Sequence, residues 1–157
     1  MQDRMIIEHI FISPSHNFVG HHGQKPGDAP AVAVDEVECA AGRGLRGDRY
    51  FDFKEDYKGQ VTFFSMEVYE DVCAHFNIAD LPPSVFRRNI LVRGVDLNSL
   101  IGREFEIQGV KFSGTQEAAP CRWMNHAFAE GAEEALRGRG GLRARILNDG
   151  VLKLGAA

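Results

Sequence analysis

The chain has 157 residues, 44% of them hydrophobic and 25% charged, a composition that excludes disordered, collagen-like and coiled-coil proteins. Eighteen Lys and Arg residues against 22 Asp and Glu residues give a net charge of -4, which is the wrong sign for a protein that coats nucleic acid. A chain of this length buries roughly 68–70% of its unfolded surface on folding, so we expect one domain over residues 1–157 that needs no disulfides.

The first part of the chain is expected to form strands. Residues 5–12 (MIIEHIFI) are rich in β-formers and predict the first strand. Residues 13–30 (SPSHNFVGHHGQKPGDAP) are dense in turn residues and predict one long surface loop, a feature that is often functional in a compact domain. Residues 31–39 alternate with period two and then shift phase, which predicts a strand with a bulge. A further strand is expected at 61–65.

A helix is predicted in the segment SMEVYEDVCAHFN, with Ser65 as N-cap and Asn77 at its end. Four residues recur at the i, i+3, i+4, i+7 spacing of one helical face: Tyr69, Val72, Cys73 and Phe76. Because Cys73 belongs to this apolar face, we interpret it as a packing residue.

After two prolines the pattern returns to strands. Residues 89–93 predict a short strand, residues 96–102 a single helical turn, and residues 104–112 a β-hairpin whose two-residue loop is Gln108-Gly109. This register puts four apolar side chains on one face. A second helical region is expected from about Pro120 to Phe128, with a continuation at 132–137. Two final strands, 142–147 and 151–155, are expected around the turn residues 148–150.

Short strands therefore dominate, with two helical regions and no regular strand-helix alternation. This pattern predicts a mostly β (α+β) fold, a β-barrel with helices packed outside it or across its ends. The segment GRGLRG at 42–47 matches a dinucleotide-binding glycine pattern, but no helical periodicity follows it, which excludes that site. We interpret it instead as a loop that brings Asp48, Arg49 and Tyr50 to a site; the alternative is a plain turn.

Arginines are clumped along the chain. The clusters are Arg43, Arg46 and Arg49; Arg87 and Arg88; and Arg137, Arg139, Arg143 and Arg145. The planar guanidinium fork suits carboxylate or phosphate, so clusters on an acidic protein indicate discrete anion sites. The alternative for any one cluster is a solvated face paired with acids.

Cys121 is the main candidate for chemistry. Pro120 is favoured at the first position of a helix, which would put the Cys121 sulfur in the first turn, near unpaired N–H groups and Arg122. We therefore predict an acidic thiol, although the spacing alone is equally compatible with a structural cysteine.

The other cysteines and the histidines carry weaker signals. The three cysteines, Cys39 among them, show no CxxC spacing, which argues against a disulfide framework or a closed zinc site. The N-terminal segment resembles neither a signal peptide nor a membrane span, so we expect a cytoplasmic protein that binds no membrane. His16, His21 and His22 lie in the long loop; a metal site there is the less favoured reading against solvated side chains.

The order of features resembles the MOSC domain, named for the C-terminal part of molybdenum cofactor sulfurases. The resemblance rests on GLRGDRY (44–50), RNILVRGVDLNSLIGREFEIQGVKF (88–112), PCRWM (120–124) and GLRARILNDGVLKLG (141–155), and it spans nearly the whole chain. It implies a barrel-like β fold that binds the molybdenum cofactor (molybdopterin), with Cys121 as sulfur carrier or molybdenum ligand. One departure concerns the residues before the 89–93 strand. Many relatives have Gly-Glu-Asn where this chain has Arg87, Arg88 and Asn89, so the site here would select a different anion or lack an acid.

The resemblance assigns roles to residues from several segments. Pterin cofactors end in phosphate and carry a dithiolene, which calls for Arg forks and a soft sulfur ligand. The candidate cofactor-binding arginines are Arg49, Arg87, Arg88, Arg122 and Arg143. Asp48, Asn89 and Glu117 are candidates for orienting pterin or positioning protons, and Tyr50 is a further candidate cofactor-binding residue.

The family also suggests partners. Full sulfurases carry an aminotransferase-like, pyridoxal phosphate-binding domain, and related amidoxime-type reductases an extra β domain; this chain is expected to lack both. Sulfur would then come from a partner such as a cysteine desulfurase. Two alternatives remain open: a non-catalytic module that binds a small anionic cofactor or substrate, and a molybdenum-dependent reductase of N-hydroxylated compounds. Whether the protein is an enzyme is left open by the sequence.

Overall fold

The computed structural model describes residues 5–14 and 31–157. The strands are β1 (Ile6–Ile12), β2 (Val32–Ala33), β3 (Glu36–Ala40), β4 (Gly44–Leu45), β5 (Val61–Ser65), β6 (Ile90–Arg93), β7 (Glu104–Ile107), β8 (Val110–Glu117), β9 (Leu142–Ile146), β10 (Gly150–Lys153) and β11 (Gly155–Ala156). The helices are α1 (Met66–Phe76), α2 (Trp123–Ala127) and α3 (Ala132–Ala135), with 3-10 turns η2 (Pro83–Phe86) and η3 (Leu97–Leu100). The described chain is thus mostly β, as the sequence predicts.

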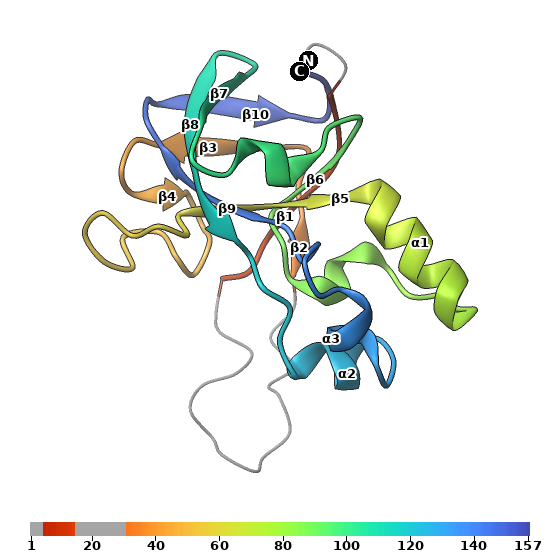
Figure 1. Ribbon diagram of the computed structural model, residues 1–157. Coiled ribbons are helices and arrows are strands. Elements are labelled where there is room, and N and C mark those ends of the chain that lie inside the picture. Colours follow the sequence, from red (N-terminus) through yellow and green to blue (C-terminus); the bar gives the residue numbers. More distant parts are fainter. Residues whose placement is uncertain (1–4, 15–30) are drawn as a thin grey trace.

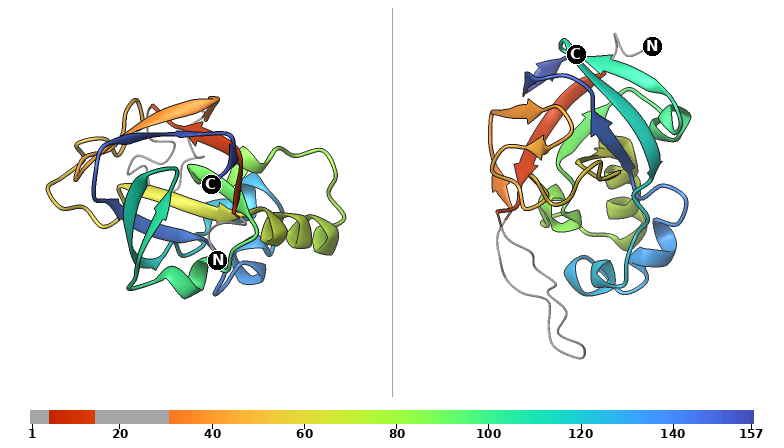
Figure 2. Two further views of the ribbon diagram at one scale, coloured as in Figure 1. Left: turned by 90° about the horizontal axis from the view of Figure 1, so that it is seen from above. Right: turned by 90° about the vertical axis from the view of Figure 1, so that its left-hand side faces the viewer.

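The strands form two sheets. The larger has the order β11-β1-β6-β5-β9-β8-β7, with β2 also paired to β1, and the smaller has the order β10-β3-β4. Most pairs are antiparallel, but β5 and β6 are parallel because α1 connects them. The pairings among the described strands do not join the two ends of either sheet, so a closed barrel is not confirmed. The helices lie together at one side of the strands (Figure 1), and two further views show the same segregation (Figure 2).

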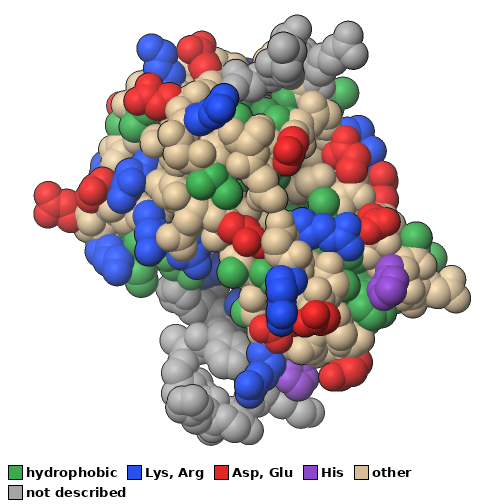
Figure 3. Space-filling view, in the orientation of Figure 1, with side chains coloured by type: hydrophobic (Ala, Val, Ile, Leu, Met, Phe, Trp, Pro, Cys, Tyr) green, Lys and Arg blue, Asp and Glu red, His purple; other side chains and the backbone are tan. Residues whose placement is uncertain are grey.

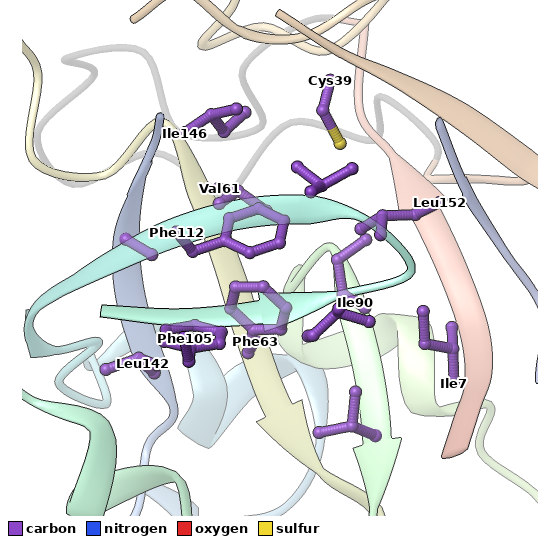
Figure 4. Packing of buried hydrophobic residues seen from close by; sticks show 14 of the residues in the cluster. Ile7, Cys39, Val61, Phe63, Ile90, Phe105, Phe112, Leu142, Ile146 and Leu152 are labelled. Carbon is purple, nitrogen blue, oxygen red and sulfur yellow. The ribbon is translucent and has the colours of Figure 1, made fainter. Parts of the chain in front are cut away.

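Two hydrophobic clusters stabilise this arrangement. The first fills the space between the sheets, where the ring of Phe63 makes edge contacts with Phe105 and Phe112 at centroid distances of 5.6 and 5.3 Å (Figure 4). The second lies under the helices and includes Tyr69 and Phe86. No helix in the described ranges is long and apolar enough to span a membrane.

Two local predictions are confirmed to the residue. The helix α1 begins after Ser65, whose hydroxyl accepts a hydrogen bond from the Val68 amide at 3.2 Å, and it ends at Asn77, which has a φ of 54°. The β7–β8 hairpin turns at Gln108-Gly109, with Phe105 opposite Phe112. Both signals are local, which explains why they could be read without the tertiary structure.

Two local predictions are wrong in detail, those of the bulge and of the start of the second helix. The phase shift within 31–39 marks a change of partner rather than a bulge, because β2 pairs with β1 whereas β3 pairs with β10. The two final strands form as predicted, with β9 in the large sheet and β10 in the small one. The second helix begins at Trp123 rather than at Pro120. Most of the predicted loop, with His16, His21 and His22, lies outside the described residues.

Candidate functional site

A cavity of about 200 Å³ opens beside the outer face of β9. Its charged and reactive lining consists of Arg49, Arg87, Arg88, Arg143 and Cys121. The rest of the lining is Tyr50, Tyr57, Gly59, Thr62, Asn89, Ala118 and Ala119. Five segments of the chain therefore meet here: the loop after β4, the start of β5, the turn before β6, the segment between β8 and α2, and β9.

The four arginines of the cavity differ from those elsewhere in the described chain. The lining holds no carboxylate. By contrast, Arg43, Arg46, Arg93, Arg137, Arg139 and Arg145 each form an ion pair with Asp or Glu. Figure 3 shows the intermixed charges of one face of the molecule. The interpretation as a solvated, acid-paired face thus holds for those six, and the cavity concentrates four guanidinium groups that have no carboxylate partner among the described residues.

Three of these guanidinium groups, those of Arg49, Arg87 and Arg143, have N–H donors without a hydrogen-bond partner among the described residues. The Nε atom of Arg49 is buried and has no hydrogen-bond partner, while its guanidinium lies 4.8 Å from the ring centre of Tyr50. Arg87 lies 4.2 Å from the ring centre of Trp123, and burial followed by the charge of Arg49 lowers the pKa of Arg87. Unused donors and mutual repulsion both favour a bound anion.

Arg88 is held differently. Its side chain donates to the carbonyl oxygens of Gly140 at 2.9 Å and Ala118 at 2.8 Å, among others. Burial lowers the pKa of Arg88 to about 10; a negative charge on Cys121 opposes this effect, and the other three cavity arginines add to it. The group therefore stays charged at neutral pH.

Cys121 is the exposed member of the three free cysteines. It lies before α2, whose N-cap is Arg122 and whose five residues begin at Trp123, so the predicted place of the sulfur in the first helical turn is wrong. The contact that the structure does give Cys121 is with the arginine-lined cavity. Burial raises the pKa of Cys39 to about 12, and Cys73 packs against the second core cluster, as predicted.

Asp48 and the lining residue Asn89 form a buried hydrogen-bonded framework at the wall of the cavity. One Asp48 oxygen accepts a hydrogen bond from the Ser13 amide at 2.8 Å and from the Asn89 side chain at 3.3 Å, and the other accepts from the Tyr50 amide at 3.3 Å. The Asn89 oxygen accepts from the Thr62 amide at 3.0 Å. These bonds fix the relative positions of the segments that carry Arg49 and Arg88.

We expect Asp48→Ala to lower the free energy of unfolding by about 1–3 kcal/mol, because the substitution leaves buried donors without an acceptor. The matched control is Asp149→Ala, since the Asp149 carboxylate also accepts from a backbone amide, that of Ala41 at 2.8 Å, but at an exposed position where water replaces it. Urea denaturation of both variants measures the difference. Equal losses of stability in the two variants would contradict the assigned framework role.

The structure gathers most, but not all, of the residues predicted for the site. Glu117 does not line the cavity; its carboxylate accepts from the Gly140 amide at 3.1 Å. Arg122 is exposed and also lies outside the lining, and Asp48 lies behind it. Tyr57 and Thr62 line the cavity but were not predicted from the sequence. The aromatic-rich segment 50–57 and the polar residue within the apolar 61–65 strand are the signals that could have indicated them.

The chain also matches a known protein family. A family model described as the MOSC domain matches residues 21–157. The chain belongs to the MOSC domain family. A search of curated proteins finds no match.

Several solved structures have a similar fold. YuaD from Bacillus subtilis has a TM-score of 0.75 at 18% identity, with 96% of this chain and 92% of that chain covered. YiiM from Geobacillus stearothermophilus has a TM-score of 0.68 at 15% identity, covering 97% and 72% of the two chains. YiiM from Escherichia coli has a TM-score of 0.61 at 17% identity, covering 92% and 69%. At these identities the likeness shows the fold.

The MOSC family is associated with the molybdenum cofactor, and the cavity can be tested against that group. Guanidinium groups with unused donors fit a terminal phosphate, and a single exposed thiol fits a soft metal that a dithiolene already holds. No group of three or more His, Cys, Asp or Glu side chains that could hold a metal ion is found in the described part of the chain. The MOSC cavity thus suits a metal that arrives with its own sulfur ligands. Its lining includes no lysine that could form an imine with pyridoxal phosphate.

Proposed function

We propose that this MOSC-domain protein binds a molybdopterin-type cofactor in the arginine-lined cavity and uses Cys121 there as a sulfur carrier or as a molybdenum ligand. The single observation that carries the proposal is the meeting of four acid-free guanidinium groups and the exposed Cys121 thiol in one cavity. When bound, such a cofactor supplies a redox-active metal and a dithiolene.

The residues divide the proposed work between two ends of the ligand. Arg49, Arg87 and Arg143 would hold the phosphate, because planar forks bind its oxygens in pairs. Cys121 would meet the sulfur-rich end, since its thiol is exposed and lines the same cavity. A chain with an exposed reduced thiol also fits the cytoplasm, where thiols are kept reduced.

The carrier role of Cys121 requires a sulfur donor, for which we propose a cysteine desulfurase. The Cys121 thiolate attacks the terminal sulfur of the donor persulfide, the donor S–S bond breaks, and the donor leaves as a thiolate. Protons balance, because one persulfide and one thiol give one thiol and one persulfide. No external oxidant or reductant is needed.

Analysis of metal and pterin in protein purified without oxygen tests the proposal. We expect molybdenum and pterin in equal amounts, and we expect both to fall in Arg143→Gln. Protein that arrives empty is then titrated with a phosphate-terminated pterin. Absence of both native content and binding of the added pterin would refute the cofactor proposal.

A second function, that of a non-catalytic module for a small anion, is favoured by the size of the cavity. At about 200 Å³ the cavity is smaller than the typical ligand pocket of about 300–1,000 Å³. Such a module binds inorganic phosphate as tightly as the pterin phosphate, whereas the cofactor site binds the pterin more tightly. Retention of molybdenum would in turn favour the reductase of N-hydroxylated compounds.

A further inference from the structure

The four cavity arginines are not equivalent, and we infer that Arg88 is a positioning residue that fixes the segment carrying Cys121 instead of binding the anion. The inference rests on the proposed function, in which Cys121 must be held facing the anion site. It assigns a division of labour within one cationic cluster, with Arg88 acting on the protein and the other three arginines acting on the ligand.

The first observation is the use of the Arg88 donors. Its Nε donates to the Gly140 oxygen at 2.9 Å, and its Nη2 donates to the Ala118 oxygen at 2.8 Å and the Ala119 oxygen at 3.3 Å. Its Nη1 donates to the Phe86 oxygen at 3.3 Å. One side chain therefore ties together the end of η2, the turn before β9 and the segment that leads to Cys121.

The second observation is that the turn before β9 and the segment that leads to Cys121 also form hydrogen bonds with each other. The Ala118 amide donates to the Gly141 oxygen at 2.9 Å, and the Gly140 amide donates to the Glu117 carboxylate at 3.1 Å. Glu117, a candidate for orienting pterin, thus instead holds the turn before β9 through Gly140. We call this set of bonds the Arg88 bracket; its members are Glu117, Ala118, Ala119, Gly140 and Gly141, with Arg88 at the centre.

The third observation is how closely the two segments approach. A Cβ atom on Gly140 would lie 2.3 Å from the Ala118 oxygen and 2.8 Å from Pro120 Cδ. Gly141 has a φ of +121°, and a Cβ atom there would lie 2.4 Å from the Phe63 oxygen. Since the shortest contact at each glycine is to a backbone oxygen, only glycine permits the approach. The bracket is therefore built at a fixed geometry that ends at Ala119, one residue before Pro120 and two before Cys121.

The remaining arginines have no such bonds. The Arg49 Nε lacks a partner, and no side-chain hydrogen bond is found for Arg87 or Arg143 within residues 5–14 and 31–157. The Nε and both Nη groups of Arg88 donate hydrogen bonds to carbonyl oxygens. Arg88 therefore attracts an anion by its charge but has few free donors to bind it. Lysine at position 88 would keep the charge and lose the fork, because an ammonium group cannot span three segments.

Four variants distinguish a role in the Arg88 bracket from a role in ligand binding: Arg88→Lys, Arg88→Gln, Arg143→Lys and Arg143→Gln. We expect both Arg88 variants to raise hydrogen exchange of the 117–122 amides by about tenfold or more, because charge-assisted bonds are lost. Arg88→Lys should keep its affinity for inorganic phosphate within about threefold of the wild type, since the charge remains. Arg143→Gln should weaken phosphate binding by about tenfold and leave the exchange unchanged, and Arg143→Lys should restore part of the binding.

Where the Arg88 variants do not fold, Glu117→Ala replaces them, with Glu117→Gln as its control because the amide keeps an acceptor oxygen. We then expect faster exchange in 117–122 at unchanged phosphate affinity for the alanine variant alone. The inference is overturned if Arg88→Lys exchanges like the wild type, if Arg143→Gln loosens the segment equally, or if Glu117→Ala has no effect. Failure of the wild type to bind phosphate or pterin would sink the proposed function, while the exchange data would still judge the bracket.

Discussion

Replacing Cys121 by serine is expected to abolish sulfur uptake from a cysteine desulfurase and to leave the protein folded. The side chain is exposed and belongs to neither hydrophobic cluster, so its replacement removes no packing. A hydroxyl cannot accept the terminal sulfur of a persulfide under these conditions, since thiol–persulfide exchange requires a thiolate. The expected loss is therefore complete.

Mass spectrometry of the intact protein after incubation with a desulfurase and cysteine measures the uptake, as the addition of one sulfur atom to the peptide containing Cys121. The matched control is Cys73→Ser, because Cys73 is a free cysteine that packs against the second cluster outside the cavity. Cys39 serves as an internal control, since burial raises the pKa of its thiol to about 12 and so suppresses its thiolate. Loading that persists in Cys121→Ser, or that disappears in Cys73→Ser, contradicts the carrier role.

The parts of the fold that could be predicted are those specified by neighbouring residues. Ser65 caps α1 through a bond to an amide three residues away, and the Gln108-Gly109 turn pairs residues that are adjacent in the hairpin. Partner choice between distant strands has no local signal. The shift at 34–35 therefore looks like a bulge in the sequence, although it marks the passage from one sheet to the other.

The candidate site shows the same limit. Arginine clusters and a cysteine after a proline indicate the residue types of the site, but long-range contacts decide which arginines enter the cavity. Arg143 and Arg145 lie on the same face of β9, yet Arg145 bonds Asp56 whereas Arg143 lines the cavity. Pro120 suggested a helix start, but α2 begins at Trp123, and the carbonyl groups of the residues before Pro120 accept hydrogen bonds from Arg88, a long-range contact with no local signal in the sequence.

Exchanging both Arg49 and Arg143 for glutamine is expected to weaken binding of a phosphate-terminated ligand by roughly 100- to 10,000-fold. Each arginine offers charge-assisted hydrogen bonds of about 1.5–3 kcal/mol, and about 1.4 kcal/mol corresponds to a tenfold change in affinity. Both side chains line the cavity and neither has a carboxylate partner in the described chain, so no described carboxylate competes with the ligand for them.

The same double variant should not lose stability without ligand, because it relieves repulsion within the cavity. The charge of Arg49 lowers the pKa of Arg87, after the larger effect of burial, and Arg143 and Arg49 both contribute to the lowered pKa of Arg88. A lowered pKa of a cation means that the folded state disfavours its charged form. Removing two of the four charges therefore raises both pKa values and favours folding.

Calorimetric titration and thermal unfolding together measure these opposite signs. The control is Arg103→Gln/Arg137→Gln, which changes the net charge equally at two exposed positions outside the cavity. Purely long-range attraction of the ligand would weaken binding equally in both double variants, and a structural role of Arg49 and Arg143 would lower the unfolding temperature of the ligand-free protein. Weaker binding together with unchanged or higher stability distinguishes a specific anion site from both alternatives. Only arginines that repel one another in the ligand-free protein and bind the ligand directly combine the two effects.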